Sequence, residues 1–412
     1  MYTNYRYPFQ IGASSIVFPL VPGGLLPNLT TLADELKAAD YSTHAVGKWH
    51  LGFCKESYLP TSRGFDHHYG FWVGAEDYYD HTRANSGKMK RSGKMGYDFR
   101  DDMEVDPSAK GEYSSILFGK RAEKIIANHN QSNPLFLYLP FQSVHNPLQA
   151  PQEYVDMYRS VQNEDRRVFL GMVTAMDDAV GVVIRSLKQA GMFDNTIIIF
   201  FSDNGGAVKY GASNWPLRGQ KSTLFEGGTR TPAFIHGPGL SPRVEERMFH
   251  VTDWYPTLLD AVNLKPKGHQ IDGISEWIGL SDNLKDWKRN EIVYDIRTTP
   301  TGGFPVSAIR IGDWKYLWHV TGFDGWEKPP EGTNSSSHVM ISNDFSHTNQ
   351  LFNLAEDPLE KNNLADIEPE RAMKMKAKLK KHREKEVDLD FKHKEPAGRP
   401  DNFGGIWSTG WC

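Results

Sequence analysis

An acidic residue and an amide stand side by side after a strongly apolar run. Residues 196–201 read Thr-Ile-Ile-Ile-Phe-Phe, and residues 202–206 read Ser-Asp-Asn-Gly-Gly. A carboxylate and a carboxamide offer the hard oxygen donors that Ca²⁺ and Mg²⁺ prefer, and adjacent glycines let the backbone approach closely. Asp203 and Asn204 are therefore candidate metal ligands. The structural alternative is a simple Asx turn after a strand.

Two histidines and a lysine follow two other segments that read as strands. His145 comes shortly after the run 134–141, and Lys48 and His50 follow residues 42–47. Because Lys48 and His50 are two residues apart, an extended chain points both side chains to one side. A histidine at such a place serves as a general acid or base near neutral pH. The alternatives are a histidine bonded to nearby backbone and an exposed lysine.

A loop dense in glycine and cations lies further along the chain. Residues 215–230 include Arg218, Lys221 and Arg230, a composition that suits wrapping an anion. The alternative is a solvated loop. Together, the metal ligands, the two lysines and the two histidines describe one site. It fits an oxyanion ester that is held by metal and cations, with a histidine to protonate the leaving alcohol.

The elements that must position these residues alternate between strands and helices up to about residue 290. Helices are expected at 29–39, 113–128, 165–191 and 251–262, and strands at 42–47, 134–141, 196–201 and 230–237. Residues 65–110 are expected to be loop-like. This alternation is typical of a doubly wound α/β domain with a mostly parallel sheet, where ligands bind at the carboxyl ends of strands.

The alternation of strands and helices stops after residue 290. Short strands follow one another without helices between them, and a basic helix comes last; the expected ranges are 291–296, 306–311, 314–319 and 350–354 for the strands and 368–387 for the helix. Residues 321–349 are expected to form a long surface loop. We therefore predict a catalytic domain over 1–290 and an α+β subdomain over 291–412, built as a small antiparallel sheet with one helix.

Length and charge exclude several classes of protein. At about 150 residues per domain, 412 residues predict two or three domains. Lys and Arg number 47 against 51 Asp and Glu, a net charge of −4, which argues against a nucleic-acid binder. No apolar run approaches 18 residues, so no transmembrane anchor is expected. Two cysteines, Cys54 and Cys412, exclude a disulfide-rich scaffold and leave their own pairing open.

Several of these segments resemble the sulfatase family. The matching stretches are 47–52 (Gly-Lys-Trp-His-Leu-Gly), 143–147 (Ser-Val-His-Asn-Pro), 202–206, 215–219 with 226–228, 252–259 and 351–364. Their order and spacing, with residues 63–65 and 76–79, are most similar to the arylsulfatase B type, the N-acetylgalactosamine-4-sulfatases. The resemblance extends over nearly the whole chain.

The resemblance implies a fold and a set of roles. The fold is an alkaline-phosphatase-like α/β/α sandwich with a small C-terminal antiparallel domain. Asp203 and Asn204 would be two of the Ca²⁺ ligands, and Lys48 and Lys221 would hold the sulfate oxygens. His145 would be the general acid. His50 would orient the formylglycine nucleophile.

The sequence also departs from the family. Sulfatases make formylglycine from a cysteine in a C-x-P-S-R or similar motif, and no such motif is present. Cys54 precedes Lys-Glu and Cys412 is the last residue, so neither suits as the precursor. Two further Asp ligands of the family, from a strand ending Asp-Asp, also have no counterpart. The resemblance thus implies a chain that begins after the nucleophile motif, without a signal peptide, and that is inactive as written.

Two hypotheses follow, with a third beside them. The first is a sulfuric ester hydrolase of the lysosomal or secreted route, acting on sulfated carbohydrate or aryl sulfate. The second is a degenerate, non-catalytic binding protein, and the third a phosphate-ester hydrolase of the same superfamily. Sequons at Asn28, Asn130 and Asn334 would carry glycans only in the secretory route. The sequence leaves the oligomeric state open.

Two basic segments are candidate polyanion contacts. The helix segment 371–385 carries eight Lys and Arg, and its main interpretation is a solvated face. Lys88, Lys90, Arg91 and Lys94 in the expected loop are the better candidates for contact with a glycosaminoglycan.

Overall fold

A five-stranded sheet forms the centre of the molecule. The computed structural model describes residues 5–13, 17–84, 95–267, 270–281, 287–297, 306–320, 325–331, 349–387 and 394–412. The strand order is β6–β5–β2–β1–β7. β1 (Ser42–Lys48) pairs in parallel with β2 (His67–Phe71) and with β7 (Leu135–Tyr138). β5 (Arg100–Asp101) and β6 (Glu104–Val105) extend the sheet beyond β2 as antiparallel strands.

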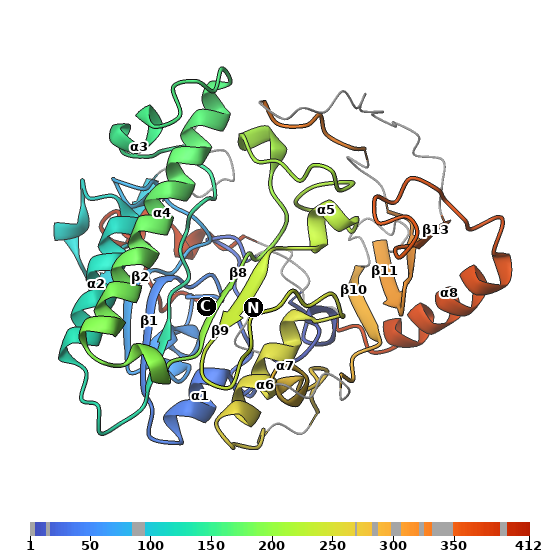
Figure 1. Cartoon of the computed structure of the whole chain (residues 1–412). Coiled ribbons are helices and arrows are strands. Elements are labelled where there is room, and N and C mark those ends of the chain that lie inside the picture. Colours follow the sequence, from blue (N-terminus) through green and yellow to red (C-terminus); the bar gives the residue numbers. More distant parts are fainter. Residues whose placement is uncertain are drawn as a thin grey trace.

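Helices cover both faces of this sheet (Figure 1). α2 (Ser114–Asn128) and α4 (Glu164–Gln189) pack together on one face, and α3 (Gln152–Asp156) contacts α4. α1 (Leu32–Lys37) lies on the other face with α6 (Trp254–Ala261), through a buried cluster of Leu32, Leu36, Tyr255 and Leu259. The α/β/α layering therefore agrees with the sequence prediction. None of the described helices is long and apolar enough to span a membrane.

A second, two-stranded sheet lies beside the first. β8 (Ile198–Phe201) and β9 (Ala233–His236) pair in antiparallel fashion. The sequence had suggested parallel neighbours for β8, because its apolar residues suit burial on both faces. Within the described residues β8 pairs only with β9, and β7 only with β1. The side chains of β7 and β8 are consequently only half-buried, and they line the large cavity described below.

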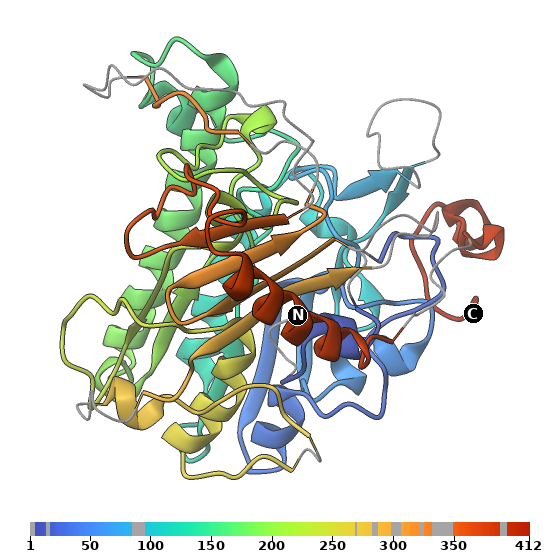
Figure 2. The same ribbon diagram turned by 90° about the vertical axis from the view of Figure 1, so that its right-hand side faces the viewer.

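The C-terminal subdomain is an antiparallel sheet of four strands, as predicted. Its strands follow chain order: β10 (Glu291–Arg297), β11 (Val306–Ile311), β12 (Trp314–Trp318) and β13 (Asn349–Asn353). α8 (Pro369–Arg383) lies across this sheet, as Figure 2 shows, and buries Ala372, Met375 and Leu379. Met373 and Val387, at 63% and 43% exposure, belong to the solvated side of this segment.

The region 65–110 is the main error of the sequence prediction. It contains β2, β5 and β6, and also the hairpin of β3 (Thr82–Ala84) and β4 (Met95–Tyr97). These strands are short, and β2 carries two histidines, so no alternating apolar pattern marks them. Pairing with β1 makes β2 a strand. Lys88, Lys90, Arg91, Lys94 and Asn334 lie outside the described residues, as does most of 321–349.

The end of the chain returns to the first domain. Cys54 and Cys412 form a disulfide across 358 residues of sequence. Trp407 is fully buried in the core around Phe53 and Trp72, and its Nε1 donates to the carbonyl of Arg83 at 3.1 Å. The C-terminal segment therefore holds the β3–β4 hairpin against the core. The domain boundary near residue 290 stays a prediction.

Candidate active site

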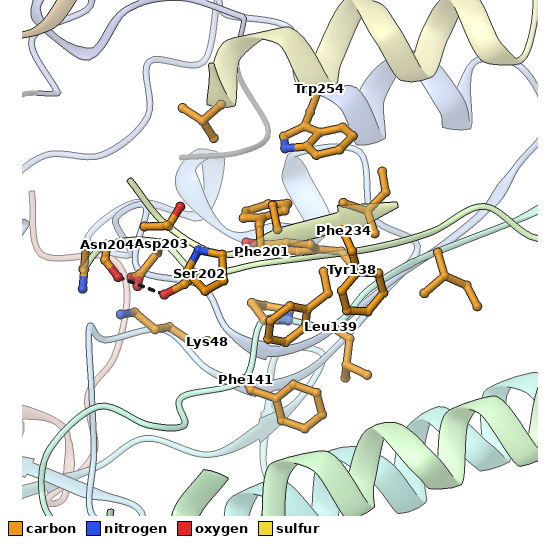
Figure 3. A pocket seen from close by; sticks show the side chains of 18 of the residues that line it. Lys48, Tyr138, Leu139, Phe141, Phe201, Ser202, Asp203, Asn204, Phe234 and Trp254 are labelled. Atoms are coloured by element: carbon orange, nitrogen blue, oxygen red, sulfur yellow. Dashed lines mark hydrogen bonds between the residues drawn. The ribbon is translucent and has the colours of Figure 1, made fainter. Parts of the chain in front are cut away.

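A cavity of about 2690 Å³ lies at the carboxyl ends of β1, β7 and β8. It is lined by all six residues that the sequence singled out, Lys48, His50, His145, Asp203, Asn204 and Lys221. Figure 3 shows Lys48, Asp203 and Asn204 close to one another, and Tyr138, Phe234 and Trp254 farther along the cavity. The cavity therefore joins a polar part at the strand ends to an apolar part between β7 and β8.

The end of β1 presents Lys48 and His50. The N–H of Lys48 donates to the carbonyl of Pro140 at 2.9 Å, and that of His50 to Trp72 at 3.1 Å. Gly47 precedes them at φ 131°, where a Cβ atom would lie 2.2 Å from the Pro140 carbonyl oxygen. His50 itself has φ 58°, a left-handed conformation that costs energy in a non-glycine residue. Such local strain is common at functional sites.

His145 lies in the loop after β7, and buried hydrogen bonds fix that loop. Gln142 is buried, accepts from the N–H of Glu76 at 2.9 Å and donates to its carbonyl at 2.7 Å. Tyr78 donates its hydroxyl to the carbonyl of His145 at 2.8 Å. The Nδ1 of His145 lies 2.7 Å from the carbonyl of Asn146. The backbone contact expected of a structural histidine is therefore present, and it directs Nε2 away from that carbonyl.

The loop after β8 carries Asp203 and Asn204. Ser202 donates its hydroxyl to the carbonyl of Asn204 at 2.9 Å, and the Asn204 amide donates to the carbonyl of Gly205 at 2.8 Å. The Asn204 side-chain nitrogen thus has a partner within the loop, while the Asp203 side chain is exposed to the cavity. Neither of these hydrogen bonds uses a side-chain oxygen of Asp203 or Asn204.

The loop that carries Lys221 packs directly on the Asp203 loop. The N–H of Lys221 donates to the carbonyl of Gly206 at 3.1 Å, and the N–H of Gly205 to that of Gly228 at 3.0 Å. A Cβ atom at Gly205 would lie 1.8 Å from the carbonyl oxygen of Gly227. Only glycine fits this approach, which explains the glycine pairs seen in the sequence.

A buried ion triad anchors this loop to the C-terminal sheet. Lys315 of β12 places Nζ 2.8 Å from Glu226 Oε1 and 2.9 Å from Glu360 Oε1. Glu226 begins the short helix α5 (Glu226–Thr229), and its N–H donates to Glu360 at 2.7 Å. Arg218 donates to the carbonyl of Glu360 at 2.8 Å and stacks on Phe225. The C-terminal subdomain therefore fixes the loop between Arg218 and α5.

The cavity holds an excess of positive groups. Burial lowers the pKa of Lys48 to about 8; Asp203 opposes this, while Lys221 and Arg83 lower it further. Burial lowers the pKa of His145 to about 4, with Lys221 and Lys48 adding to the effect. The pKa of His50 also falls well below its usual range, chiefly through burial and then Lys48. Both histidines are thus neutral at pH 7 without a ligand, and a bound anion would raise both pKa values.

Sequence reasoning missed two cations at or near this site. Arg83 of β3 lines the cavity, and Lys315 holds the loop that carries Lys221. Arg83 lay in a region expected to be a loop, and Lys315 looked like an ordinary strand residue. A lysine in an otherwise apolar strand was the only available signal for Lys315.

Residues 1–264 match the family model described as sulfatase. This chain belongs to the sulfatase family. It is 36% identical to arylsulfatase J of Mus musculus over 425 aligned residues, which cover 98% of this chain and 70% of that protein. It is 28% identical to N-acetylgalactosamine-6-sulfatase of Mus musculus, over 87% of this chain and 69% of that protein. The family prediction is confirmed, while the arylsulfatase B type stays a prediction.

Solved structures confirm the fold of this sulfatase. The crystal structure of Ps i-CgsB matches with a TM-score of 0.77 at 26% identity, over 94% of this chain and 82% of that chain. A complex of the same protein with k-i-k-neocarrahexaose also gives 0.77, at 25% identity, over 96% and 83%. The alkaline-phosphatase-like α/β/α sandwich with a small C-terminal antiparallel sheet is therefore correct.

The family's Ca²⁺ and formylglycine do not fit the described residues by themselves. Ca²⁺ takes six to eight oxygens, and Asp203 and Asn204 supply two side chains. Within the described ranges no group of three or more His, Cys, Asp or Glu is arranged to hold a metal. Cys54 and Cys412 are joined to each other, so neither is a free precursor of formylglycine.

Proposed function

We propose that this sulfatase-family chain binds the sulfate group of sulfated carbohydrates or aryl sulfates between Lys48 and Lys221. The observation that carries this proposal is that Lys48 and Lys221 line one cavity, in which Asp203 is the carboxylate that acts on Lys48. Lys221 lowers the pKa of Lys48, and an anion that lies between the two cations would offset this repulsion. Sulfate supplies that anion and accepts charge-assisted hydrogen bonds from both lysines.

The remaining residues take roles around this anion. His145 lines the cavity with both lysines and would be the general acid toward the leaving alcohol if a nucleophile were supplied. His50 has φ 58° and lies two residues from Lys48. It would position a nucleophile for attack on the sulfur atom.

We propose further that the chain as written binds sulfate without hydrolysing its esters. A general acid and cationic groups remain, but a displacement without a positioned nucleophile is slower by orders of magnitude. The substrate class is that of glycosaminoglycan-type sulfated sugars, as in the arylsulfatase B type. A lysosomal or secreted location agrees with the Cys54–Cys412 disulfide and with sequons at Asn28 and Asn130, both exposed.

Calorimetric titration of the full chain with inorganic sulfate at pH 7 tests the binding proposal. We expect saturable binding, weakened about tenfold or more in Lys48→Met and in Lys221→Met, because each loses a charge-assisted bond. Lys209→Met is the matched control, since Lys209 is exposed on the neighbouring loop. Wild-type protein that does not bind sulfate, or a Lys209→Met loss as large as the others, would overturn the proposal.

Turnover of p-nitrocatechol sulfate by the purified chain tests the second part. We expect no hydrolysis above the uncatalysed rate. Measurable turnover that His145→Ala abolishes would contradict this part and leave the sulfate-binding proposal in place. Turnover of p-nitrophenyl phosphate without sulfate binding would favour the phosphate-ester alternative instead.

A further inference from the structure

Arg83 is a cavity-lining cation that no part of the proposed function uses. It lies in the middle of β3 and lines the same cavity as Lys48 and His50. Its Nη1 atom is buried and has no hydrogen-bond partner. A buried guanidinium without a partner is costly, because it has lost water and gained no acceptor.

Two buried arginines, Arg63 and Arg289, have acceptors in place. Arg63 donates to the carbonyl groups of Leu25 and Leu26, both at 3.0 Å. Arg289 forms a two-pronged ion pair with Asp253. Arg83 differs from both, since no hydrogen bond joins its guanidinium to a described residue. The difference indicates an acceptor that arrives with a ligand.

Glu76 and Asp77, two acidic residues near Arg83 in the sequence, each have another partner for at least one carboxylate oxygen. Glu76 Oε1 lies 2.9 Å from Nδ1 of His81. Asp77 accepts from the N–H groups of Tyr79 and Asp80 at 3.0 and 2.9 Å, and from the side chain of Gln149 at 2.8 Å. Burial lowers the pKa of Arg83, and no carboxylate offsets that effect. The guanidinium nevertheless stays charged at every physiological pH.

The backbone of Arg83 is held rigidly. It pairs with Gly96 of β4, and its carbonyl accepts the indole N–H of Trp407. Trp407 is fully buried, and a Cβ atom at Gly96 would lie 2.8 Å from its Nε1. These contacts fix the position of the Arg83 backbone beside the cavity.

Arg83 acts electrostatically on one residue of the proposed sulfate site. The largest electrostatic effects of side chains on His145 come from Lys221, Lys48 and Asp203, whereas Arg83 acts on Lys48. Arg83 lines the same cavity as these residues. An anion at Arg83 would be close to the scissile sulfate without being that sulfate.

We propose that Arg83 forms a second anion-binding position, which takes a carboxylate or a second sulfate on the sugar that carries the scissile sulfate or on its neighbour. This inference rests on the proposed function, because it places the second anion relative to sulfate between Lys48 and Lys221. A planar guanidinium matches either oxyanion in a two-pronged geometry. The site thus selects doubly anionic sugars over monosulfated neutral ones.

Calorimetric titration of the full-length Arg83→Gln chain tests this. The probes are inorganic sulfate, N-acetylgalactosamine-4-sulfate, its 4,6-disulfate, and a 4-sulfated chondroitin disaccharide that carries one uronate. We expect the variant to bind the first two within twofold of wild type, and at least one doubly anionic probe about tenfold or more weaker. If Arg83→Gln loses affinity only for the disaccharide, the anion that binds Arg83 is a carboxylate. If it loses affinity only for the disulfate, that anion is a second sulfate.

Two further variants control for charge and folding. Arg159→Gln removes an exposed arginine and should leave all four affinities unchanged. Arg83→Lys keeps the charge without the planar fork, and we expect an intermediate loss on the same probe even if Arg83→Gln does not fold. If Arg83→Gln loses as much affinity for inorganic sulfate as for the doubly anionic probes, Arg83 belongs to the scissile-sulfate site. If it loses affinity for no probe, Arg83 binds no ligand. Either result overturns the inference.

Failure of the proposed function gives a different pattern. If wild-type protein binds the disaccharide but not inorganic sulfate, the sulfate proposal fails, while a loss in Arg83→Gln still supports an anion at Arg83. If wild-type protein binds none of the four probes, both proposals are wrong.

Discussion

Two lysines, Lys315 and Lys48, lie in regions with opposite electrostatics. Lys315 is fully buried between Glu226 and Glu360, and although burial lowers its pKa, the two carboxylates outweigh that effect and raise it. Lys48 faces the cavity, where its pKa falls to about 8 and Asp203 is the one carboxylate that opposes the fall. Both lysine ammonium groups lie in low-dielectric surroundings. Only Lys315 is held between two carboxylates, Glu226 and Glu360.

The difference separates a cation that holds the structure from one that is kept for a ligand. The Lys315 triad joins β12 to α5, and α5 in turn packs on the Asp203 loop through backbone contacts. The Lys48 region stores an unfavourable electrostatic free energy, which an arriving anion relieves. Removing each lysine should therefore change stability in opposite directions.

The largest effect is expected for Lys315→Ala. Two buried carboxylates would lose their shared cation, and we expect unfolding to become easier by about 3–5 kcal/mol. Urea denaturation monitored by tryptophan fluorescence measures this change. Lys378→Ala is the matched control, because Lys378 pairs with Glu291 at the surface and should cost less than about 1 kcal/mol. If Lys315→Ala lowers the free energy of unfolding no more than Lys378→Ala does, Lys315 does not hold the structure as proposed.

A smaller effect of opposite sign is expected for Lys48→Met. Replacing a cation that sits among other cations should raise the free energy of unfolding at pH 7 by on the order of 1–3 kcal/mol. The same urea experiment measures it, without sulfate. Added sulfate should then stabilise the wild-type chain and have little effect on the variant. Destabilisation by Lys48→Met would show that Lys48 supports the fold as Lys315 does.

The smallest effect concerns pH. The folded pKa of Lys48, about 8, lies below the unfolded value of 10.5, so the unfolded chain binds more protons between these limits. The wild-type chain should therefore gain stability relative to Lys48→Met as pH rises from 8 to 10.5. Sulfate affinity should fall over the same range, by up to about tenfold per pH unit, because the ligand needs the charged lysine. A pH-independent difference between the two proteins would contradict the assignment.

The sequence by itself predicted much of the site. Strands read from apolar runs ended at polar residues, and parallel α/β sheets gather strand ends at one edge, so Lys48, His145 and Asp203 were expected to meet. The structure brings them to one cavity. β7 and β8 could be predicted from local pattern alone, because each lies in a continuous apolar run of the sequence.

Other features were decided only by the tertiary structure. Strand β2 forms although its sequence lacks an alternating apolar pattern, because pairing with β1 satisfies its backbone. Lys315 meets Glu226 across 89 residues of sequence, and Arg83 enters the cavity because Trp407, from the far end of the chain, holds its strand. A local pattern records which face of an element is apolar. Which charges are paired and which are left for a ligand depends on contacts between distant segments, and those exist only once the chain has folded.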